Sequence, residues 1–504
     1  MKELPIGIQD FRKLREGNFL YVDKTKEIEK LTRGAGYYFL SRPRRFGKSV
    51  LLSAMKYLFQ GKRELFNGLS ITDKWDWEKT NPVVHISFSS IGHHKLGLEK
   101  AIDLTLTKIG DQHGITLANT SIDQKLKKLL EELYNQEGEV VILIDEYDKP
   151  LIDYLGDNLE QALSNQKILK TFYSIIKDCD TYIRLLFITG VSKFSKVGIF
   201  SDLNNLRDLT TSRKFSTICG YTEEELHHYF TEYAEEEPTP QFWEKVRNWY
   251  NGYSWDAKTY VYNPFSVLNY FAEGEFNNYW FETGTPTFLI QLLKKEFYYD
   301  FNRVRTGKIG FNSYNIEELE PLPLLFQTGY LTIKHKDDRN IYTLGYPNDE
   351  VKESMLEHLI GAFRHGGVTR SHPIVMDLTD AFKNDDIENV ISIINTLFAS
   401  IPNQIFINKK EAYFHSVVYL AFQFLGQYID AEVNTASGRI DAVLQTNTHI
   451  YVIEFKLDKG AKEAIQQIKD KGYADKYQHS KKIVKLLGIS FGSKEKKVVE
   501  WLLE

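Results

Sequence analysis

The sequence predicts an α/β protein with a parallel sheet in its first half, a helical middle segment and a smaller α/β domain at its C-terminal end. Three observations support this class. Apolar strand-like runs alternate with amphipathic helices in the first half, the middle is rich in Tyr and Trp without such alternation, and the chain ends with strand, turn, strand and helix. With 504 residues the chain is too long for one hydrophobic core, so two or three domains are expected.

The first half contains the elements of a parallel sheet covered by helices. Helical spacing of apolar residues alternates with short, continuous apolar runs, and this order is typical of strands joined by crossover helices. The expected strands are 37–40, 83–88, 140–144 and 185–188, and the expected helices are 49–59, 121–134 and 165–176.

The C-terminal part follows a plausible linker, the glycine-containing stretch Gly361–Gly367. Helices are expected beyond it, followed by a strand hairpin and a last helix. The expected helices are 380–399, 411–426 and 462–473, and the expected strands are 431–433, 438–444 and 450–456.

Composition narrows the setting of the protein. The two cysteines, Cys179 and Cys219, offer neither a disulfide framework nor zinc-ligand spacing, which favours a reducing cytoplasm. We find no apolar run of about 18 residues, so no membrane partner is expected. The net charge is −5, yet Lys456–Glu504 holds twelve Lys against seven acidic residues. This basic end fits either attraction to a nucleic-acid backbone or a solvated helix face.

A candidate phosphate-binding loop follows the first expected strand and reads RPRRFGKS. Gly47 allows close approach of the backbone to an anion, Lys48 is expected to reach the β- and γ-phosphates, and Ser49 to hold Mg²⁺. Arg42 occupies a position where the generic pattern has Gly, and a helix start carrying Lys and Ser by chance is the alternative. The remaining candidate nucleotide contacts are Arg44, Arg45 and Phe46.

Two acidic residues end the third expected strand. Ligands of parallel sheets bind at the carboxyl ends of strands, so Asp145 is expected in the Mg²⁺ shell and Glu146 is expected to orient or deprotonate the attacking water. A solvated acidic turn containing Asp148 is the alternative. Because this strand end and the phosphate loop are independent parts of one site, their joint presence favours an ATPase that uses ATP and Mg²⁺.

Further candidates follow the fourth expected strand. Thr189 or Ser192 is the expected sensor of the γ-phosphate, although either hydroxyl could instead bond its own turn. Arg207 and Arg213 are weak candidates for an arginine finger, and both could equally form surface ion pairs.

The C-terminal hairpin carries a second candidate site. Asp441 and Glu454 can face each other across neighbouring strands, and Glu454 and Lys456 share one face of their strand. Two carboxylates suit a divalent metal, and the lysine could offset charge at a phosphate in the transition state. A charged hairpin with an ion pair between Glu454 and Lys456 is the alternative.

Several further motifs accompany the two candidate sites, and the full set is LPIGIQDF, YVDKT, RPRRFGKS, VILIDEYDKP, FITGVSKFS, YNGY and YNPFS. Together these motifs resemble the bacterial AAA-ATPase-like family, whose members typically carry a C-terminal PD-(D/E)XK nuclease-like domain. The resemblance covers nearly the whole chain and implies that a loop beginning RPRR is the usual form, with a winged-helix segment after the core. By the nuclease resemblance, Asp441, Glu454 and Lys456 are catalytic, and Gln466 and Glu411 are auxiliary.

The expected domains are an AAA-type P-loop ATPase core over 1–235, a helical or winged-helix segment over 236–360, and a PD-(D/E)XK nuclease-like domain over 365–504. Three functions fit this reading: an ATP-dependent DNA nuclease, a regulatory ATPase whose nuclease fold only binds nucleic acid or a partner, and an NTP-binding switch. ATP, DNA and a homo-oligomer are the expected partners, since AAA-type ATPases commonly form rings.

Overall fold

The computed structural model covers the chain from Met1 to Glu504. The description below applies to all residues except 35, 157, 194–199, 201, 202, 204, 235, 236, 282–288, 291, 294–300, 302, 303, 313–315, 318, 364–370, 400–409, 427–429, 437, 438 and 478. Only the backbone is described for residues 312, 363, 371, 410–416, 430–436 and 439–441.

The chain divides into two compact units. The first comprises Met1–Thr285 with Phe301–Glu350, and the second comprises Pro286–Asp300 with Val351–Glu504. The middle segment up to Glu350 therefore packs as part of the first unit. Among the described residues, no helix combines the length and the apolar character needed to cross a membrane.

A five-stranded parallel sheet forms the centre of the first unit, in the order β2-β3-β4-β1-β5. All four expected strands are present, and the short β5 was not expected. Every residue of β3 is buried, as its continuous apolar run predicts for a strand covered on both faces. The strands are β1 (Gly36–Ser41), β2 (Val83–Ser87), β3 (Val140–Asp145), β4 (Ile183–Gly190) and β5 (Leu206–Asp208).

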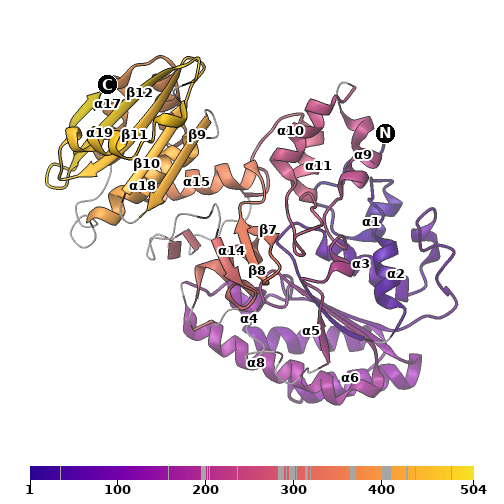
Figure 1. Ribbon diagram of the computed structural model, residues 1–504. Coiled ribbons are helices and arrows are strands. Elements are labelled where there is room, and N and C mark those ends of the chain that lie inside the picture. The colour runs from indigo at the N-terminus through magenta and orange to yellow at the C-terminus, as the bar shows by residue number, and fades with distance from the viewer. Residues whose placement is uncertain are drawn as a thin grey trace. The chain divides into compact units, whose positions relative to one another are not determined.

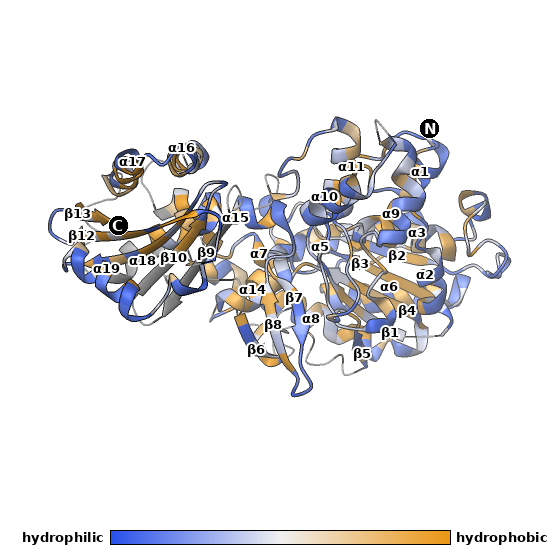
Figure 2. Cartoon of the chain, turned by 45° about the horizontal axis from the view of Figure 1, so that its top comes forward, coloured by the Kyte–Doolittle hydropathy of each residue, from blue (hydrophilic) through white to orange (hydrophobic). Residues whose placement is uncertain are grey.

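Helices cover both faces of this sheet. Helices α5, α6 and α8 gather on one side, and α1 and α3 lie on the other (Figure 1). The neighbouring strands β3 and β4 are mostly coloured hydrophobic in Figure 2, whereas the helices alternate between the two colours, as amphipathic helices do. The helices of this part are α1 (Phe11–Glu16), α2 (Thr25–Thr32), α3 (Lys48–Phe59), α4 (His93–Leu96), α5 (Leu98–Gln112), α6 (Ile122–Glu137), α7 (Lys149–Ile152) and α8 (Leu159–Asp178), with 3-10 turns at Arg63–Phe66, Asp180–Tyr182 and Arg213–Phe215.

The order of the strands decides where the functional residues meet. Strand β4 lies between β1 and β3, with Leu40 opposite Thr189 and Ile144 opposite Ile188. Because all these strands run in one direction, their carboxyl ends share one edge of the sheet. The loop after β1 therefore faces the ends of β3 and β4, although β3 ends about 100 residues and β4 about 150 residues after β1.

The middle segment combines helices with a three-stranded antiparallel sheet of order β6-β8-β7. Its aromatic residues form a core: Tyr250, Tyr262 and Phe230 are fully buried together with residues of the N-terminal segment such as Leu20. The elements are α9 (Glu223–Phe230), a 3-10 turn at Thr231–Tyr233, α10 (Pro240–Tyr250), α11 (Pro264–Glu273), β6 (Val304–Gly307), α13 (Ile309–Asn312), α14 (Pro321–Thr328), β7 (Thr332–Lys336) and β8 (Ile341–Gly345).

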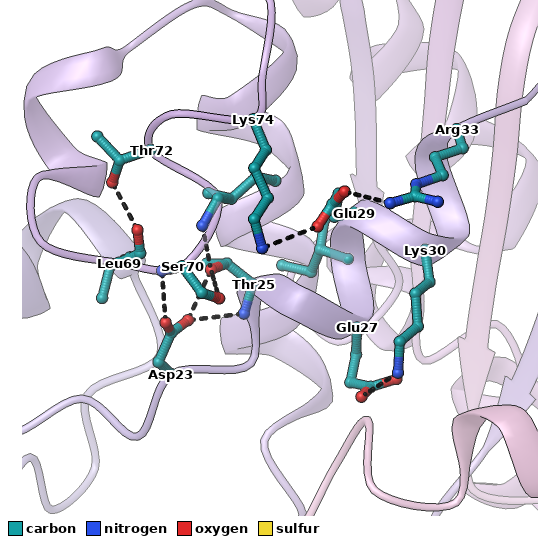
Figure 3. A network of polar contacts seen from close by, with 12 residues as sticks. Asp23, Thr25, Glu27, Glu29, Lys30, Arg33, Leu69, Ser70, Thr72 and Lys74 are labelled. Atoms are coloured by element: carbon teal, nitrogen blue, oxygen red, sulfur yellow. Dashed lines mark hydrogen bonds and ion pairs between the residues drawn. The ribbon is translucent and has the colours of Figure 1, made fainter.

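The YVDKT motif forms a polar turn that starts α2. Asp23 accepts hydrogen bonds from the backbone and hydroxyl of Thr25, at 2.8 and 2.6 Å, and from the Ser70 backbone at 2.7 Å (Figure 3). Further along α2, Glu29 pairs with Arg33 and Lys74. These bonds tie α2 to the segment around Ser70 and so fix the backbone that precedes the helix.

The second unit is built around a mixed sheet of order β13-β12-β11-β10-β9. Only β11 and β12 run parallel, and α19 packs on them. The strands are β9 (Asp430–Ala436), β10 (Arg439–Gln445), β11 (His449–Leu457), β12 (Ile483–Gly492) and β13 (Lys497–Leu503), and the helices are α15 (Asp349–Phe363), α16 (Ser371–Lys383), α17 (Ile387–Ala399), α18 (Lys410–Leu425) and α19 (Ala461–Asp470), with a 3-10 turn at Asp475–Tyr477.

The second unit differs from the sequence predictions in one helix, in two additional strands and at the expected linker. The helix expected over 380–399 is the end of α16 followed by α17, because Asp386 interrupts it by accepting a hydrogen bond from the Asn389 backbone at 3.1 Å. Strands β12 and β13 were not expected. The expected linker begins inside α15, and residues 364–367 lie outside the described residues.

Gly252 of the YNGY motif lies where the middle segment is closely packed, so a substitution there tests this packing. Its φ is +102°, and a Cβ there would collide with the carbonyl oxygen of Pro347. We expect Gly252→Ala to destabilise the first unit by more than the roughly 1–2 kcal/mol of a left-handed residue alone. Gly114→Ala is the matched control, since its φ is +70° but its Cβ meets nothing within 4 Å. Equal losses in urea unfolding would contradict the close packing at Gly252.

Candidate functional site

The candidate phosphate loop joins β1 to α3, and Lys48 is the first residue of that helix. Gly47 has a φ of +86° and Arg45 a φ of +65°, so two left-handed residues bend the chain directly before the helix. Gly47 adopts this conformation without steric cost. The turn aims the N-terminus of a 12-residue helix at the edge of the sheet, where its free N–H groups favour an anion.

Arg42 stabilises this loop from behind. It is fully buried, donates hydrogen bonds to the carbonyl oxygens of Ser41 and Thr210 at 2.8 and 2.9 Å, and stacks 3.8 Å over the Trp255 ring. Burial lowers the pKa of Arg42 to about 10. Arg42, the residue that departs from the generic glycine pattern, thus connects the start of the loop to the backbone at Thr210 and to the ring of Trp255.

Lys48 is buried beneath the loop. Its Nζ donates to the carbonyl oxygens of Arg42 and Pro43, at 3.0 and 2.9 Å. Burial lowers the pKa of Lys48, and the nearby carboxylates of Glu146 and Asp145 oppose that shift. The ammonium group is therefore held at the loop with little water around it, where its charge interacts strongly with an anion.

The ends of β3 and β4 and the first turn of α3 meet at the carboxylate of Asp145, which is 3% exposed. Ser49 Oγ donates to Asp145 Oδ2 at 2.6 Å, and Thr189 Oγ1 donates to Asp145 Oδ1 at 2.6 Å. The hydroxyl and carboxylate expected to hold Mg²⁺ are thus adjacent, and oxygen donors are the ligands that this ion prefers. Thr189, the expected sensor, contacts Asp145 and thereby orients its carboxylate.

Glu146 follows directly and has a φ of +53°, an uncommon conformation for a residue other than glycine. It lines a cavity of about 460 Å³ together with residues of the phosphate loop and α3. Among the described residues lining this cavity, neither Arg207 nor Arg213 occurs, and both side chains are exposed. The cavity is lined by Arg44, Arg45, Phe46, Gly47, Lys48, Ser49, Glu146, Lys149 and an apolar group that includes Pro5, Ile8, Leu20, Val22, Ile218 and Leu268.

Asp148 has a structural role that sequence reasoning missed. It is 1% exposed and accepts hydrogen bonds from the backbones of Val191 and Ser192, at 3.0 and 2.5 Å. The Ser192 carbonyl oxygen in turn accepts from the Tyr147 hydroxyl at 3.0 Å. Asp148 therefore fixes the turn after β4, and the backbone of Ser192 takes part in that turn. The sequence signal for this role was the position of Asp148, which follows the buried strand β3 closely in the chain.

The YNGY and YNPFS motifs enclose the outer side of the loop. Phe46 packs edge-on against Tyr253 and Trp255, with ring centroids 4.8 and 5.6 Å away. Arg45 lies 3.9 Å over the ring of Phe265. Trp280 Nε1 donates to the Arg44 carbonyl oxygen at 3.0 Å. The middle segment therefore holds the phosphate loop in shape.

The second candidate site lies on the hairpin of β10 and β11. Asp441 is the register partner of Glu454, as expected, although the Asp441 side chain lies outside the description. Glu454 is fully buried, and Lys456 Nζ donates to its Oε1 at 2.5 Å. Glu411 lies on α18, and its side chain is likewise outside the description.

Gln467, rather than the expected Gln466, completes this group. Gln467 Nε2 donates to Glu454 Oε1, and its Oε1 accepts from Lys456 Nζ at 2.6 Å. Gln466 is exposed and bonds Asp470 at 2.7 Å, because the apolar side of α19 turns it away from the sheet. The apolar spacing of α19 was the sequence signal for Gln467, because position 467 lies nearer than position 466 to the apolar side of this helix.

These folds are those of an AAA-ATPase-like P-loop domain and of a PD-(D/E)XK nuclease-like domain. The family profile described as predicted AAA-ATPase matches residues 5–200, and that of the PD-(D/E)XK nuclease superfamily matches residues 409–501. A protein of Azotobacter chroococcum mcd 1, described as an uncharacterized protein in the vnfD 5′ region, is 40% identical over 519 residues, 100% of this chain and 99% of that protein. The chain belongs to this AAA-ATPase-like family.

Asp148 also makes the stability of the first unit dependent on pH. Burial raises the pKa of Asp148 to about 6 from its usual 3.8, against the opposing effect of the Ser192 hydrogen bond. The folded chain thus holds the proton more tightly than the unfolded chain. The contribution of protonated Asp148 to the free energy of unfolding is complete below about pH 4 and is lost as the pH rises through about 6.

Because an Asn side chain does not ionise, we expect Asp148→Asn to escape the loss of stability that the wild type undergoes between pH 4 and pH 7. The difference in free energy of unfolding between the variant and the wild type should therefore change in favour of the variant, by on the order of 3 kcal/mol over this range. Urea unfolding at several pH values, followed by tryptophan fluorescence, measures this difference, since six of the seven tryptophans lie in the first unit. Parallel pH profiles for the two proteins would contradict the raised pKa.

Proposed function

We propose that this protein binds and hydrolyses ATP with Mg²⁺ in the cavity between the phosphate loop and Glu146, and that its C-terminal domain cleaves DNA. The observation that carries the ATPase proposal is the convergence of Ser49 and Thr189 on Asp145 beside the buried Lys48. A lysine, a helix N-terminus and a hydroxyl–carboxylate pair are the parts that phosphoryl transfer requires.

Each part has a distinct role in this proposal. Lys48 would exchange its hydrogen bonds to the carbonyl oxygens of Arg42 and Pro43 for contacts with the β- and γ-phosphates of ATP. Ser49 and Asp145 would hold Mg²⁺, which supplies charge neutralisation at the phosphates. Glu146, which lines the cavity, would accept the proton of the attacking water. Arg44 and Arg45 add positive charge at the same cavity.

The apolar part of the cavity supports a nucleotide rather than a simple phosphate. A volume of about 460 Å³ is in the range of small-molecule sites. Pro5, Ile8, Val22 and Leu268 offer apolar surface for a base, and they come from the N-terminal segment and α11. The N-terminal motifs would therefore contribute to recognition of the base.

The C-terminal proposal rests on the group of Glu454, Lys456 and Gln467, opposite Asp441 in the register of the hairpin. The two carboxylates would hold a divalent metal, and Lys456 would stabilise charge on the scissile phosphate. DNA is the proposed substrate, with the lysine surplus of Lys456–Glu504 attracting its backbone. Domains at 1–235, 236–360 and 365–504, a cytoplasmic location and a homo-oligomeric state belong to the same proposal.

Two substitutions separate nucleotide binding from hydrolysis. We expect Lys48→Ala to weaken ATP binding and abolish turnover, because it removes the buried positive charge. Glu146→Gln should keep ATP binding while lowering turnover by about 10²–10⁴-fold, the usual contribution of a general base. Fluorescent-nucleotide titration and phosphate release measure the two effects. Unchanged turnover in both variants would refute the ATPase proposal.

For the nuclease proposal, we expect Lys456→Ala to lower Mg²⁺- or Mn²⁺-dependent DNA cleavage by about 10²–10³-fold, the usual effect of removing a transition-state contact. Gln467→Ala should also lower it, whereas Gln466→Ala is the matched control and should cleave like the wild type. Cleavage is measured with and without ATP. If the wild type cleaves neither DNA nor RNA, the C-terminal domain is instead a binding module of a regulatory ATPase.

A further inference from the structure

A third cluster of polar side chains lies in the first unit, outside both candidate sites. His93 and His94 begin the short helix α4, and Asp153 follows α7. Nε2 of His94 lies 2.8 Å from Asp153 Oδ2, and Nε2 of His93 lies 3.3 Å from the same oxygen. Two imidazoles and a carboxylate, from segments 59 residues apart, therefore converge on one point.

The geometry of His93 is poorly explained by an ordinary hydrogen bond. Its side chain is only 3% exposed, and its Nε2 makes no hydrogen bond with any described residue, because the contact with Asp153 is not aligned. A buried polar atom without an aligned partner costs roughly 1–3 kcal/mol. The two rings lie 4.2 Å apart between centroids, so protonating both imidazoles would place two like charges in contact.

A divalent cation would satisfy all three groups at once. Ligand atoms about 2.0–2.1 Å from a tetrahedral zinc are separated by roughly 3.3 Å. His93 Nε2 lies at this distance from Asp153 Oδ2, whereas His94 Nε2, at 2.8 Å, would have to exchange its hydrogen bond for the metal and move slightly outward. The three ligand atoms lie within 4.8 Å of one another. Imidazole nitrogens favour zinc over Mg²⁺, which prefers oxygen. His94 is 55% exposed and leaves the cluster open to solvent.

The carboxylate is already prepared as a ligand. The side chain of Asp153 is only 12% exposed, so its orientation is constrained by its neighbours. Lys149 Nζ pairs with Oδ1, which leaves Oδ2 turned toward the two imidazoles. The ligand oxygen is thus oriented before any metal binds.

We propose that Nε2 of His93, Nε2 of His94 and Oδ2 of Asp153 bind a zinc-class divalent cation, with water in a fourth position. The site is separate from the Mg²⁺ proposed at Ser49 and Asp145. It adjoins the nucleotide cavity through Lys149, which both lines that cavity and pairs with Asp153. Bound metal would therefore fix the position of α7, directly after the acidic end of β3.

The test is metal binding by the full chain without nucleotide, so its outcome does not depend on the proposed ATPase activity. Metal-stripped protein is titrated with Co²⁺, a spectroscopic substitute for zinc, in excess Mg²⁺ to occupy oxygen-ligand sites. We expect one equivalent of Co²⁺ to give tetrahedral absorption bands and to be displaced by one equivalent of Zn²⁺.

Two ligand substitutions and a control decide the assignment. His94→Ala and Asp153→Asn should each weaken binding by more than the about 10–100-fold typical of an outer-shell partner. His113→Ala should bind like the wild type, because His113 forms a separate 2.7 Å pair with Glu137. Circular dichroism verifies that each variant is folded. No Co²⁺ binding by the wild type, or binding that survives both ligand substitutions, would overturn the proposal.

Discussion

The first unit depends on the carboxylate of Asp145, held between the hydroxyls of Ser49 and Thr189. A buried carboxylate is costly unless its oxygens are bonded, and both oxygens of Asp145 are. The parallel sheet makes this possible, because β4 lies between β1 and β3 and brings three strand ends to one edge. Lys48 lies at the same edge as the first residue of α3. Fold and candidate chemistry therefore share one constraint.

A second layer keeps that edge in shape. Arg42 ties the loop to the carbonyl oxygen of Thr210, while Phe46 packs among Tyr253 and Trp255 of the middle segment. The loop thus gains rigidity from residues more than 160 positions away. A rigid loop holds its donors in position before a ligand binds, which lowers the entropic cost of binding. Some of the aromatic residues of the middle segment serve this packing, whereas others form its own core.

Local patterns predicted most of the first unit. The strands were visible because buried parallel strands are continuous apolar runs, and RPRRFGKS and the acidic end of β3 pointed to the candidate site. Contacts set by long-range packing were not visible. The rotation of α19 decides that Gln467, and not Gln466, contacts Glu454, and it depends on how Ala464 and Ile465 pack on the sheet. Strand β12 was missed although its apolar residues resemble those of β11.

The interlocking of loop and middle segment limits how this protein can be divided. A fragment ending at residue 235 would keep the whole parallel sheet but lose the rings that enclose Phe46 and the indole that bonds Arg44. A chimera that combines the parallel-sheet core of this protein with the middle segment of a relative would lose the same contacts unless it kept Trp255, the stacking partner of Arg42. The two segments are therefore expected to be inherited together, as one module whose halves evolve in step.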